Sequence, residues 1–392
     1  MKTLIELYDE RPLENILATE VFRPERTVFL APPEIAENAG IADALKAFLR
    51  GRGIETRLEA LPTDMNDPEA VRASMAKVLA TWDDCALDIC GGTDAALFAG
   101  GVFAAGNDMP VFTWSRKKRR FFNIRNAPFA EVDTGFVRFS IDDVLRMAGG
   151  SMRKGRVDNG CLSQYMWLME PFFSTFMGHR KNWVHTVEYI QAVSQTVKGQ
   201  AVSLHAEGAA EVKVVHDRVR PDAGILDALA SIGMLSDVAV GEKGVSFTFV
   251  DGQIRSWLRD VGSVLELYVY KNCLDLGIYN DVRTSVIVDW AGRQETDGVS
   301  NEIDVVASRG LTPLFVSCKT GEVKTEALNE LAILRDRFGG DMARAAVVTA
   351  ENAGAALRNR AAQLRIDVID LQDLQDGQLK QRLAEVSMES VV

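Results

Sequence analysis

Two acidic residues and a lysine lie in neighbouring apolar segments of the last third of the chain. Residues 301–306 carry Glu302 and Asp304, and residues 312–319 end at Lys319. Because successive side chains of a β-strand point to opposite faces, Glu302 and Asp304 should share one face of their strand. Carboxylate oxygens are preferred ligands of Mg²⁺ and Mn²⁺ rather than of zinc. The two segments therefore predict a site that holds a hard divalent cation beside an ammonium group.

A cation held there would lower the pKa of a bound water and offset charge on a phosphorane-like transition state, while Lys319 positions or polarises that water. Glu266, in the preceding predicted helix, supplies a further acid. Cys318 is an additional candidate ligand, although packing in the core is the common role of such a residue. The alternative is that these are solvated strand residues. Against it, a lysine that follows a largely apolar strand is costly to bury without a partner.

The elements around these residues follow the order helix, three strands, helix, strand, helix, strand. Apolar periodicity predicts helices over 257–274, 325–338 and 352–364, and strands over 283–290, 301–307, 312–318, 345–349 and 366–371.

The N-terminal part has a different pattern, in which short β-branched or aliphatic runs alternate with amphipathic stretches. The predicted strands are 4–9, 27–32, 55–61, 86–90 and 110–114, and the predicted helices are 12–20, 36–51, 67–80 and 94–105. Such alternation predicts a parallel, Rossmann-like sheet with right-handed crossovers. Ligands bind beyond the carboxyl ends of strands in sheets of this kind, so the loops 8–15 and 91–94 are the candidate binding loops.

The second of these loops reads Gly91-Gly92-Thr93-Asp94. Glycines let backbone N–H groups approach a phosphate, and the following helix N-terminus favours an anion. Thr93 offers a helix-capping hydroxyl, and Asp94 either caps the helix or binds a ribose hydroxyl. A generic strand-to-helix turn explains the two glycines equally well.

The C-terminal segment resembles the PD-(D/E)XK nuclease superfamily, whose αβββαβ core carries an acid on the second strand and an acid-x-Lys pair on the third. Asp304 matches the first acid, Lys319 the lysine and Glu266 the helix acid. Ser317 stands where the pair usually has its acid. That departure leaves two readings open, an inactive site or one that Glu302 and Glu266 complete.

The strand–Gly-Gly-Thr–helix element at 88–96 resembles CARF domains, the CRISPR-associated Rossmann folds. The loop with Glu10, Arg11 and Asn15 resembles their first ligand loop. Together the two resemblances imply a CRISPR ancillary nuclease of type III systems. Its expected parts are an α/β CARF domain over 1–150, a helical connector with a winged-helix-like module over 151–256, and a restriction-endonuclease-like domain over 257–392.

This resemblance implies a homodimer that binds a cyclic oligoadenylate, with cyclic tetra-adenylate as the expected ring, across its two-fold axis. The implied ligand residues are Glu10, Arg11, Asn15, Gly91, Gly92, Thr93 and Asp94. The implied catalytic set is Glu266, Glu302, Asp304, Ser317 and Lys319, with Mn²⁺ or Mg²⁺ held by Asp304, Glu302, Glu266 and Cys318. The expected activity is ligand-activated, metal-dependent endonuclease cleavage of DNA, RNA or both in antiviral defence.

Composition limits the other function classes. The chain has 392 residues with a formal net charge of −11, which argues against a protein that coats nucleic acid through charge alone. No apolar run reaches the roughly 20 residues of a spanning helix, and the N-terminus lacks a secretory pattern, so we expect a cytoplasmic protein. The one dense basic run, 116–120, is expected at a solvated hairpin tip or in contact with phosphate.

Two other hypotheses remain open. The first is a nucleotide-sensing regulator whose nuclease fold is catalytically degenerate and whose 208–256 module binds DNA, and Ser317 favours it. The second is a constitutive repair or junction-resolving nuclease with an unrelated Rossmann-like partner domain.

Overall fold

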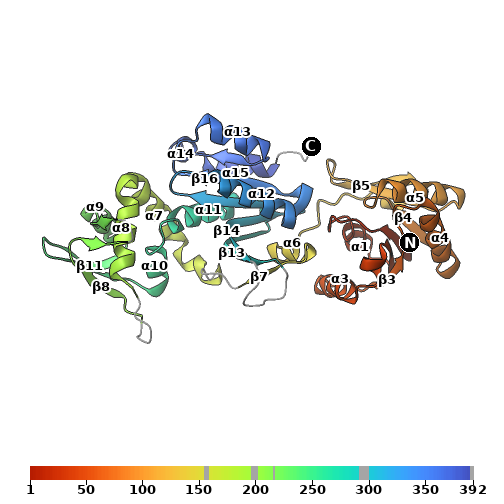
Figure 1. The fold of residues 1–392 in the computed structure, drawn as a ribbon, viewed down its shortest axis with the longest axis horizontal. Helices are drawn as coiled ribbons and strands as arrows, with labels where there is room; N and C mark the ends of the chain where they lie inside the picture. Colours follow the sequence, from red (N-terminus) through yellow and green to blue (C-terminus); the bar gives the residue numbers. More distant parts are fainter. Residues whose placement is uncertain (154–158, 196–201, 215–216, 291–299, 389–392) are drawn as a thin grey trace.

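The computed structural model describes residues 1–153, 159–195, 202–214, 217–290 and 300–388. The N-terminal lobe lies at one end of the long axis, the C-terminal sheet lies in the middle, and the helices and strands of the middle segment lie at the other end (Figure 1). The middle segment therefore follows the N-terminal lobe in sequence but does not lie between the two sheets in space. None of the described helices combines the length and apolar character needed to cross a membrane.

The N-terminal sheet has six strands in the order β3-β2-β1-β4-β5-β6. The strands are β1 (Thr3–Leu7), β2 (Arg26–Ala31), β3 (Arg57–Pro62), β4 (Cys85–Asp88), β5 (Val111–Ser115) and β6 (Arg120–Arg125). All neighbouring pairs are parallel except β5 and β6, which form an antiparallel hairpin. The order reverses between β1 and β4, and the carboxyl ends of these two strands carry both candidate binding loops.

Helices cover both faces of this sheet. On one face lie α1 (Leu17–Phe22) and α3 (Ala39–Gly51), whose Leu17 and Phe48 pack in the same core cluster as Leu4. On the other lie α4 (Pro68–Thr81) and α5 (Asp94–Gly106), packed against Ile5 and Leu87. A short helix α2 (Pro33–Ala36) precedes α3, and η1 (Pro128–Ala130) and α6 (Ile141–Met147) lead out of the lobe. Alternation of apolar side chains along β1 produces the two faces.

The C-terminal sheet also has six strands, in the order β17-β16-β15-β14-β13-β7. They are β7 (Ser151–Arg153), β13 (Asp281–Asp289), β14 (Ser300–Arg309), β15 (Thr312–Lys319), β16 (Arg344–Thr349) and β17 (Asp367–Ile369). From β7 to β15 the neighbours are antiparallel, and from β15 to β17 they are parallel. The edge strand β7 is far from the others in sequence.

Helices flank this sheet as well. The apolar side chains of α11 (Ser263–Leu276) and α15 (Leu379–Met388) share a core cluster with Val316. On the opposite side α12 (Thr325–Gly339) packs in the cluster that contains Phe315. The remaining elements are η3 (Gly340–Met342), α13 (Ala355–Gln363) and α14 (Leu371–Gln375). The predicted mixed α/β fold class and the helix–strand order after residue 257 are confirmed.

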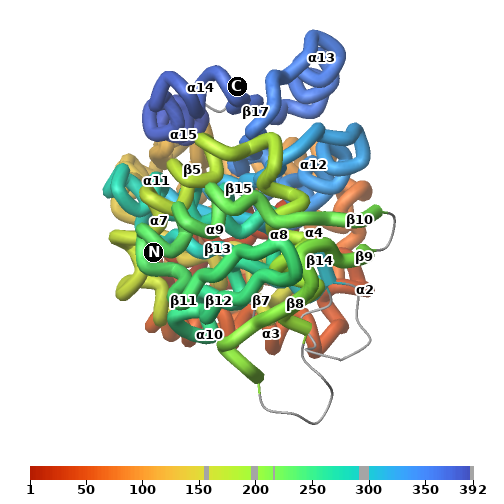
Figure 2. Tube along the Cα trace, turned by 90° about the vertical axis from the view of Figure 1, so that its left-hand side faces the viewer, coloured from red at the N-terminus to blue at the C-terminus, as the bar shows by residue number. Residues whose placement is uncertain are grey.

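The middle segment forms the third part of the molecule, which lies in the foreground of Figure 2. Its helices are η2 (Asn159–Tyr165), α7 (Met166–Gly178), α8 (Arg180–Val193), α9 (Ala223–Ser231) and α10 (Gly252–Trp257). The strands β8 (His205–Gly208), β11 (Leu235–Val240) and β12 (Val245–Phe249) form an antiparallel sheet in the order β11-β12-β8, and β9 (Val212–Lys213) pairs with β10 (Arg218–Val219). Its aromatic side chains Phe172, Phe176 and Trp183 are buried in the core, whereas Trp167 is 65% exposed.

Two predicted helices differ most from the observed ones at their first residues. The helix predicted over 12–20 begins only at Leu17, because Asn15 bonds both backbone groups of Asp9 and holds the preceding residues in a loop. The helix predicted over 257–274 begins only at Ser263 as α11, and Trp257 is the last residue of α10. Asp260 accepts the Ser263 N–H and begins the second helix there, which places Glu266 in its first turn.

Candidate active site and ligand loop

Asp304 lies where the hydrogen-bond ladder between β14 and β15 ends. The last register pair joins Val305 to Val316, and beyond it the Cys318 backbone N–H donates to Asp304 Oδ2 at 2.6 Å. The Ser317 hydroxyl donates to the same oxygen at 3.2 Å. A side-chain carboxylate therefore takes the place of a backbone acceptor, and this fixes Asp304 relative to both strands.

Lys319 is the third donor to that oxygen, with its Nζ 3.2 Å from Asp304 Oδ2. Burial opposes the charge of Lys319, but the Asp304 carboxylate outweighs it and raises the pKa of the ammonium above its ordinary value. Lys319 is therefore a fixed positive charge and not a proton acceptor at neutral pH. Ser317, where the resemblance described above would lead one to expect an acid, contributes a hydrogen bond to Asp304.

Glu266 belongs to the same electrostatic environment. Burial, and then the negative charges of Asp304, Asp260 and Glu302, raise the pKa of Glu266 to about 8, against the opposing charge of Lys319. The predicted acids from α11 and β14 are thus close enough to interact. A buried carboxyl among other carboxylates resists ionisation until a cation compensates it.

A small cavity opens beside these residues. It has a volume of about 60 Å³ and is lined by Glu302, Asp304, Ser317 and Lys319 from the strands. One face of α12 lines the opposite wall, including Glu330. This volume admits water and a small ion but not a nucleotide, so a substrate would have to approach from outside.

Glu330 is a residue that the sequence patterns did not single out. Its Oε1 accepts a hydrogen bond from Asn301 Nδ2 at 2.6 Å, which connects α12 to the start of β14. Ala327, Leu331 and Leu334 flank it in the cavity wall. Their spacing of three and four residues is the signal that would have placed this face of the helix against the sheet.

The Cys318 side chain points to the opposite face of β15 from Ser317 and Lys319. Its side chain is buried in the core cluster that contains Val316 and Val348. Burial, and then the charges of Asp304 and Glu266, raise the pKa of the Cys318 thiol well above its ordinary value. The thiol therefore stays protonated, and the contact of this residue with the site is made by its backbone N–H.

The donor set fits a divalent cation in its chemistry. Within the described part of the chain, no group of three or more His, Cys, Asp or Glu side chains is already arranged around one point as metal ligands. Asp304 nevertheless offers a carboxylate held in place by hydrogen bonds. Glu266 offers a buried carboxyl that a cation would help to ionise. Asp304, Glu266 and Glu302 are suitable ligands for a divalent cation, whereas the buried, protonated thiol of Cys318 is not.

The first candidate binding loop is organised by Asp9, which the sequence patterns also did not single out. The guanidinium of Arg11 donates to both Asp9 carboxylate oxygens at 2.8 and 2.7 Å. Asn15 Oδ1 accepts the Asp9 N–H and Asn15 Nδ2 donates to the Asp9 carbonyl. Asp9 Oδ2 also accepts the Gly92 N–H at 2.9 Å. Asp9 therefore joins the two predicted loops across the point where the strand order reverses.

The second loop requires glycines because its backbone passes close to the side chains of Leu7 and Asp9. Gly92 has φ +107°, and a Cβ there would lie 2.8 Å from Leu7 Cβ. A Cβ on Gly91 would lie 2.7 Å from Asp9 Cβ. The Thr93 hydroxyl accepts the Ala96 N–H and caps α5, as expected, while Asp94 lies exposed in the first helical turn. Glu10 is exposed at the far side of the loop.

A pair of buried acids lies beneath these loops, and neither was predicted. Glu6 on β1 and Asp88 on β4 are register partners, and each is 1% exposed. Burial raises the pKa of Asp88 to about 7. Burial, and then the charge of Asp88, raise the pKa of Glu6 well above its ordinary value.

The basic run 116–120 lies at the tip of the β5–β6 hairpin, as expected, but it is not simply solvated. Arg116 forms ion pairs with Glu14 and with Asp341 of the C-terminal part. Arg119 donates to Thr312 Oγ1 at the start of β15. Two arginines of the run therefore bind the C-terminal lobe.

Comparisons with known proteins agree with this arrangement. Residues 257–390 match the family model of the Card1-like endonuclease domain. A search of curated proteins gave no match. Among solved structures, the chain shares its fold with protein VC1899 from Vibrio cholerae, at TM-score 0.76 and 20% identity, covering 98% of this chain and 97% of that one.

A second structure shares the fold over the whole chain. Can2 from Sulfobacillus thermosulfidooxidans, solved in complex with cyclic tetra-adenylate, superposes with TM-score 0.73 at 16% identity and covers 99% of both chains. The resemblance predicted from the sequence is confirmed to this extent: residues 257–390 match the Card1-like endonuclease domain, and the chain has the fold of Can2 over its length.

Proposed function

We propose that this protein is a metal-dependent endonuclease that a cyclic oligoadenylate activates in type III CRISPR antiviral defence. The observation that carries the proposal is the Asp304–Lys319 pair at the end of the β14–β15 ladder, inside the segment that matches an endonuclease family. The cyclic tetra-adenylate bound to Can2 supports the ligand class. DNA, RNA or both are the proposed substrates, and the cytoplasm is the proposed location.

The proposed division of the chain is a ligand-sensing domain over 1–150, a connector with a winged-helix-like module over 151–256 and a nuclease domain over 257–392. We propose that the protein works as a homodimer and that Arg11, Asn15 and the Gly91–Asp94 loop face the ligand with Glu10. The position of these loops at the reversal of the strand order supports this assignment.

Each residue of the candidate active site has a distinct part in the proposed hydrolysis. A divalent cation, Mg²⁺ or Mn²⁺, would supply Lewis-acid activation of water and charge compensation at the phosphate. Asp304, with Glu266 and Glu302, would hold it. Lys319 keeps its proton and places a positive charge beside the phosphate oxygens as negative charge develops there. Ser317 and the Cys318 N–H keep Asp304 in place.

The regulator hypothesis has less support from the residues. Ser317 does not disrupt the site, because its hydroxyl bonds the acid that remains. The 208–256 module has more acidic than basic residues, whereas a duplex-binding module needs a basic face. Sequence-specific DNA binding without cleavage would nevertheless decide in favour of a regulator.

The decisive experiment measures cleavage of a supercoiled plasmid and of a single-stranded RNA with Mn²⁺, with and without cyclic tetra- and hexa-adenylate. We expect wild-type cleavage to depend on both metal and activator, and Asp304→Asn to abolish it. The matched control is Glu326→Gln, an exposed acid on α12 outside the cavity wall. Activity that survives Asp304→Asn would refute the site, and activity independent of any activator would favour the constitutive nuclease.

A further inference from the structure

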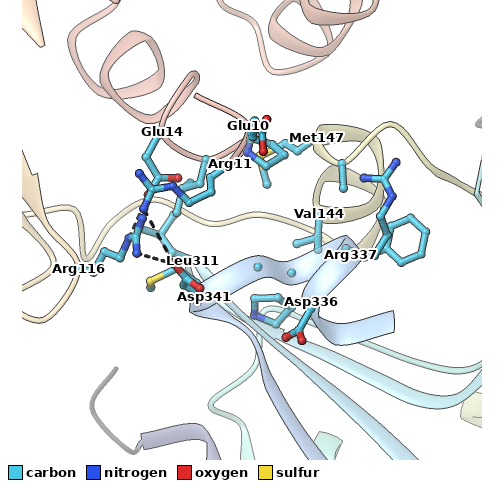
Figure 3. Close-up of a pocket in the computed structure, with 18 residues that line it drawn as sticks. Glu10, Arg11, Glu14, Arg116, Val144, Met147, Leu311, Asp336, Arg337 and Asp341 are labelled. Atoms are coloured by element: carbon cyan, nitrogen blue, oxygen red, sulfur yellow. Dashed lines mark hydrogen bonds and ion pairs between the residues drawn. The ribbon is translucent and has the colours of Figure 1, made fainter. Parts of the chain in front are cut away.

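A second cavity, of about 270 Å³, lies between the N-terminal lobe and the C-terminal sheet (Figure 3). One wall is the ligand loop that follows β1, from Glu10 to Glu14, together with Arg116 from the hairpin tip. The other wall is the end of α12 and the turn after it, from Asp336 to Met342. The loop proposed to bind the activator is therefore also a surface that contacts the nuclease lobe.

Ion pairs cross this cavity. Arg116 lies at their centre, with Nη1 2.7 Å from Asp341 Oδ2 and Nε 3.0 Å from Glu14 Oε1. Arg11 Nη1 lies 3.9 Å from Glu14 Oε1 and 4.0 Å from Asp341 Oδ2. Figure 3 shows these four side chains converging from both lobes. We call Arg11, Glu14, Arg116 and Asp341 the interlobe latch.

Arg11 connects the latch to the ligand loop. Its guanidinium binds both oxygens of Asp9, and Asp9 Oδ2 in turn accepts the Gly92 N–H. The Asp9 carboxylate thus occupies the donors that an anionic ligand would need at this loop. A phosphate that takes the Gly92 N–H and the Arg11 guanidinium must displace Asp9, and it draws Arg11 away from its other acidic neighbours.

On the side of the C-terminal lobe, the latch is connected to the active-site cavity through α12. Asp341 lies in η3, directly after α12, and the other half of α12 forms a wall of the active-site cavity through Glu330 and Leu334. A helix moves as a unit, so a change at its C-terminal end reaches the cavity without further contacts. Contact through α12 alone does not establish that ligand binding changes the active site. Coupling also requires the ligand to interact differently with the latched and the open state. The competition between the ligand and Asp9 for Arg11 supplies that difference.

We propose that the interlobe latch restrains the nuclease lobe, and that an anionic activator opens it by taking Arg11 from Asp9. The proposal rests on the proposed function, since it assigns the regulation of that same active site. Because binding free energies are linked, a change that weakens the latch should also strengthen activator binding, by up to the same factor.

The test uses the full-length protein with Asp341→Asn, Arg116→Gln and the double variant. A partly exposed ion pair changes an equilibrium by roughly two- to five-fold. We therefore expect each single variant to bind cyclic tetra-adenylate roughly two- to five-fold more tightly by titration calorimetry. Cleavage without activator should rise by a similar factor. Because the two residues share one interaction, the double variant should show less than the product of the single effects.

The matched control is Asp336→Asn. Asp336 lines the same cavity, but its ion pairs are with Arg335 and Arg365 of its own lobe. We expect its activator affinity and its basal cleavage to equal those of the wild type. Unchanged affinity and unchanged basal cleavage in Asp341→Asn would overturn the latch, as would weaker activator binding, which would mean that Asp341 transmits activation and does not restrain it.

A third measurement separates failure of the latch from failure of the proposed function. If the wild type binds no cyclic oligoadenylate, the proposed ligand class is wrong, but the latch can still be judged by hydrogen exchange without any ligand. Asp341→Asn, a change in the C-terminal lobe, should then speed exchange in residues 9–15 of the N-terminal lobe, and Asp336→Asn should not. Equal exchange in the two variants would overturn the latch whatever the ligand.

Discussion

Cys318 donates its backbone N–H to Asp304 Oδ2 at 2.6 Å, at the point where β14 and β15 stop pairing through their backbones. Beyond the last backbone pair, the Asp304 carboxylate is the acceptor for the Cys318 N–H. The same oxygen accepts hydrogen bonds from the Ser317 hydroxyl and from Lys319 Nζ. Asp304 therefore binds three donors of the neighbouring strand. This arrangement explains how a serine can replace the acid of the superfamily pattern while Asp304 and Lys319 stay in register.

Lys319→Gln tests whether the fixed charge contributes to cleavage. The substitution keeps a hydrogen-bond donor near Asp304 but removes the charge that would stabilise a developing phosphate anion. Loss of such a group lowers turnover by roughly 100-fold or more. We expect this loss in single-turnover cleavage with Mn²⁺ and activator, with activator affinity unchanged because the ligand loop is in the other lobe.

The control for Lys319→Gln is Lys324→Gln, which removes an exposed lysine shortly after the same strand. It should cleave at the wild-type rate. Equal activity of the two variants would show that Lys319 has no role in catalysis, and a loss of activator affinity in Lys319→Gln would show that the variant has perturbed more than the active site.

Glu266→Gln tests the buried carboxyl through its pH dependence. The folded-state pKa is raised to about 8, so the folded protein keeps a proton that the unfolded chain releases above its ordinary pKa. Stability therefore falls as pH rises between about 4.5 and 8. The loss specific to the wild type should be roughly 3–4 kcal/mol between pH 5 and pH 8, and Glu266→Gln should not show it.

Urea-induced unfolding at pH 5, 6.5 and 8 measures this difference, and Mg²⁺ adds a second readout. Because a carboxylate must lose its proton to bind a metal, Mg²⁺ should stabilise the wild type more than Glu266→Gln at pH 7, with release of a proton. Calorimetry in buffers of different ionisation enthalpy detects that proton. If the free energies of unfolding of the two proteins changed with pH in the same way, Glu266 would not be a buried carboxyl with a raised pKa.

The strands of the candidate active site could be predicted because their signal is local. Alternation within 301–306 and 312–319 placed Asp304 and Lys319 on neighbouring strands, and the apolar runs fixed the order of the surrounding elements. Asp9 could not be found in this way. A single acid at a strand end has no periodicity, and its bond to Gly92 joins positions 83 residues apart.

The contacts between the two lobes could not be predicted from the sequence for the same reason. Arg116 was visible only as part of a basic run, and its partner Asp341 is 225 residues away. Charge patterns identify an arginine but do not identify its acid, because a partner is chosen by tertiary packing. The buried Glu6 and Asp88 were hidden too, since each lies in a short apolar strand that reads simply as core.

Gly92→Ala tests the geometry of the ligand loop. At φ +107° with a Cβ 2.8 Å from Leu7 Cβ, alanine is both strained and crowded, so we expect a loss of stability of about 1–3 kcal/mol. The control is Gly101→Ala within α5, where a Cβ would meet nothing within 4 Å. Alanine there should stabilise the helix by about 1 kcal/mol. Thermal unfolding followed by circular dichroism compares them, and equal midpoints would contradict the described loop conformation.

Asp88→Asn tests the buried acid pair beneath the ligand loop. The folded-state pKa of Asp88 is raised to about 7, mainly by burial, so its contribution to stability declines as pH rises from about 4 to 7. Asparagine can still accept the Cys90 N–H that Asp88 Oδ1 accepts at 2.8 Å, but it carries no charge. The variant should therefore unfold at higher urea concentration than the wild type at pH 8 and at a similar concentration at pH 5.

Combining Asp88→Asn with Glu266→Gln gives the most stringent form of this test. Asp88 lies on β4 of the N-terminal sheet and Glu266 on α11 beside the C-terminal sheet, and they share no hydrogen-bond partner among their described contacts. Their effects at pH 8 should therefore add to within about 0.5 kcal/mol. At pH 5 both carboxyls are protonated in the folded protein, and the double variant should gain little over the wild type. A gain at pH 5 as large as that at pH 8 would show that the substitutions act through packing and not through the cost of burying charge.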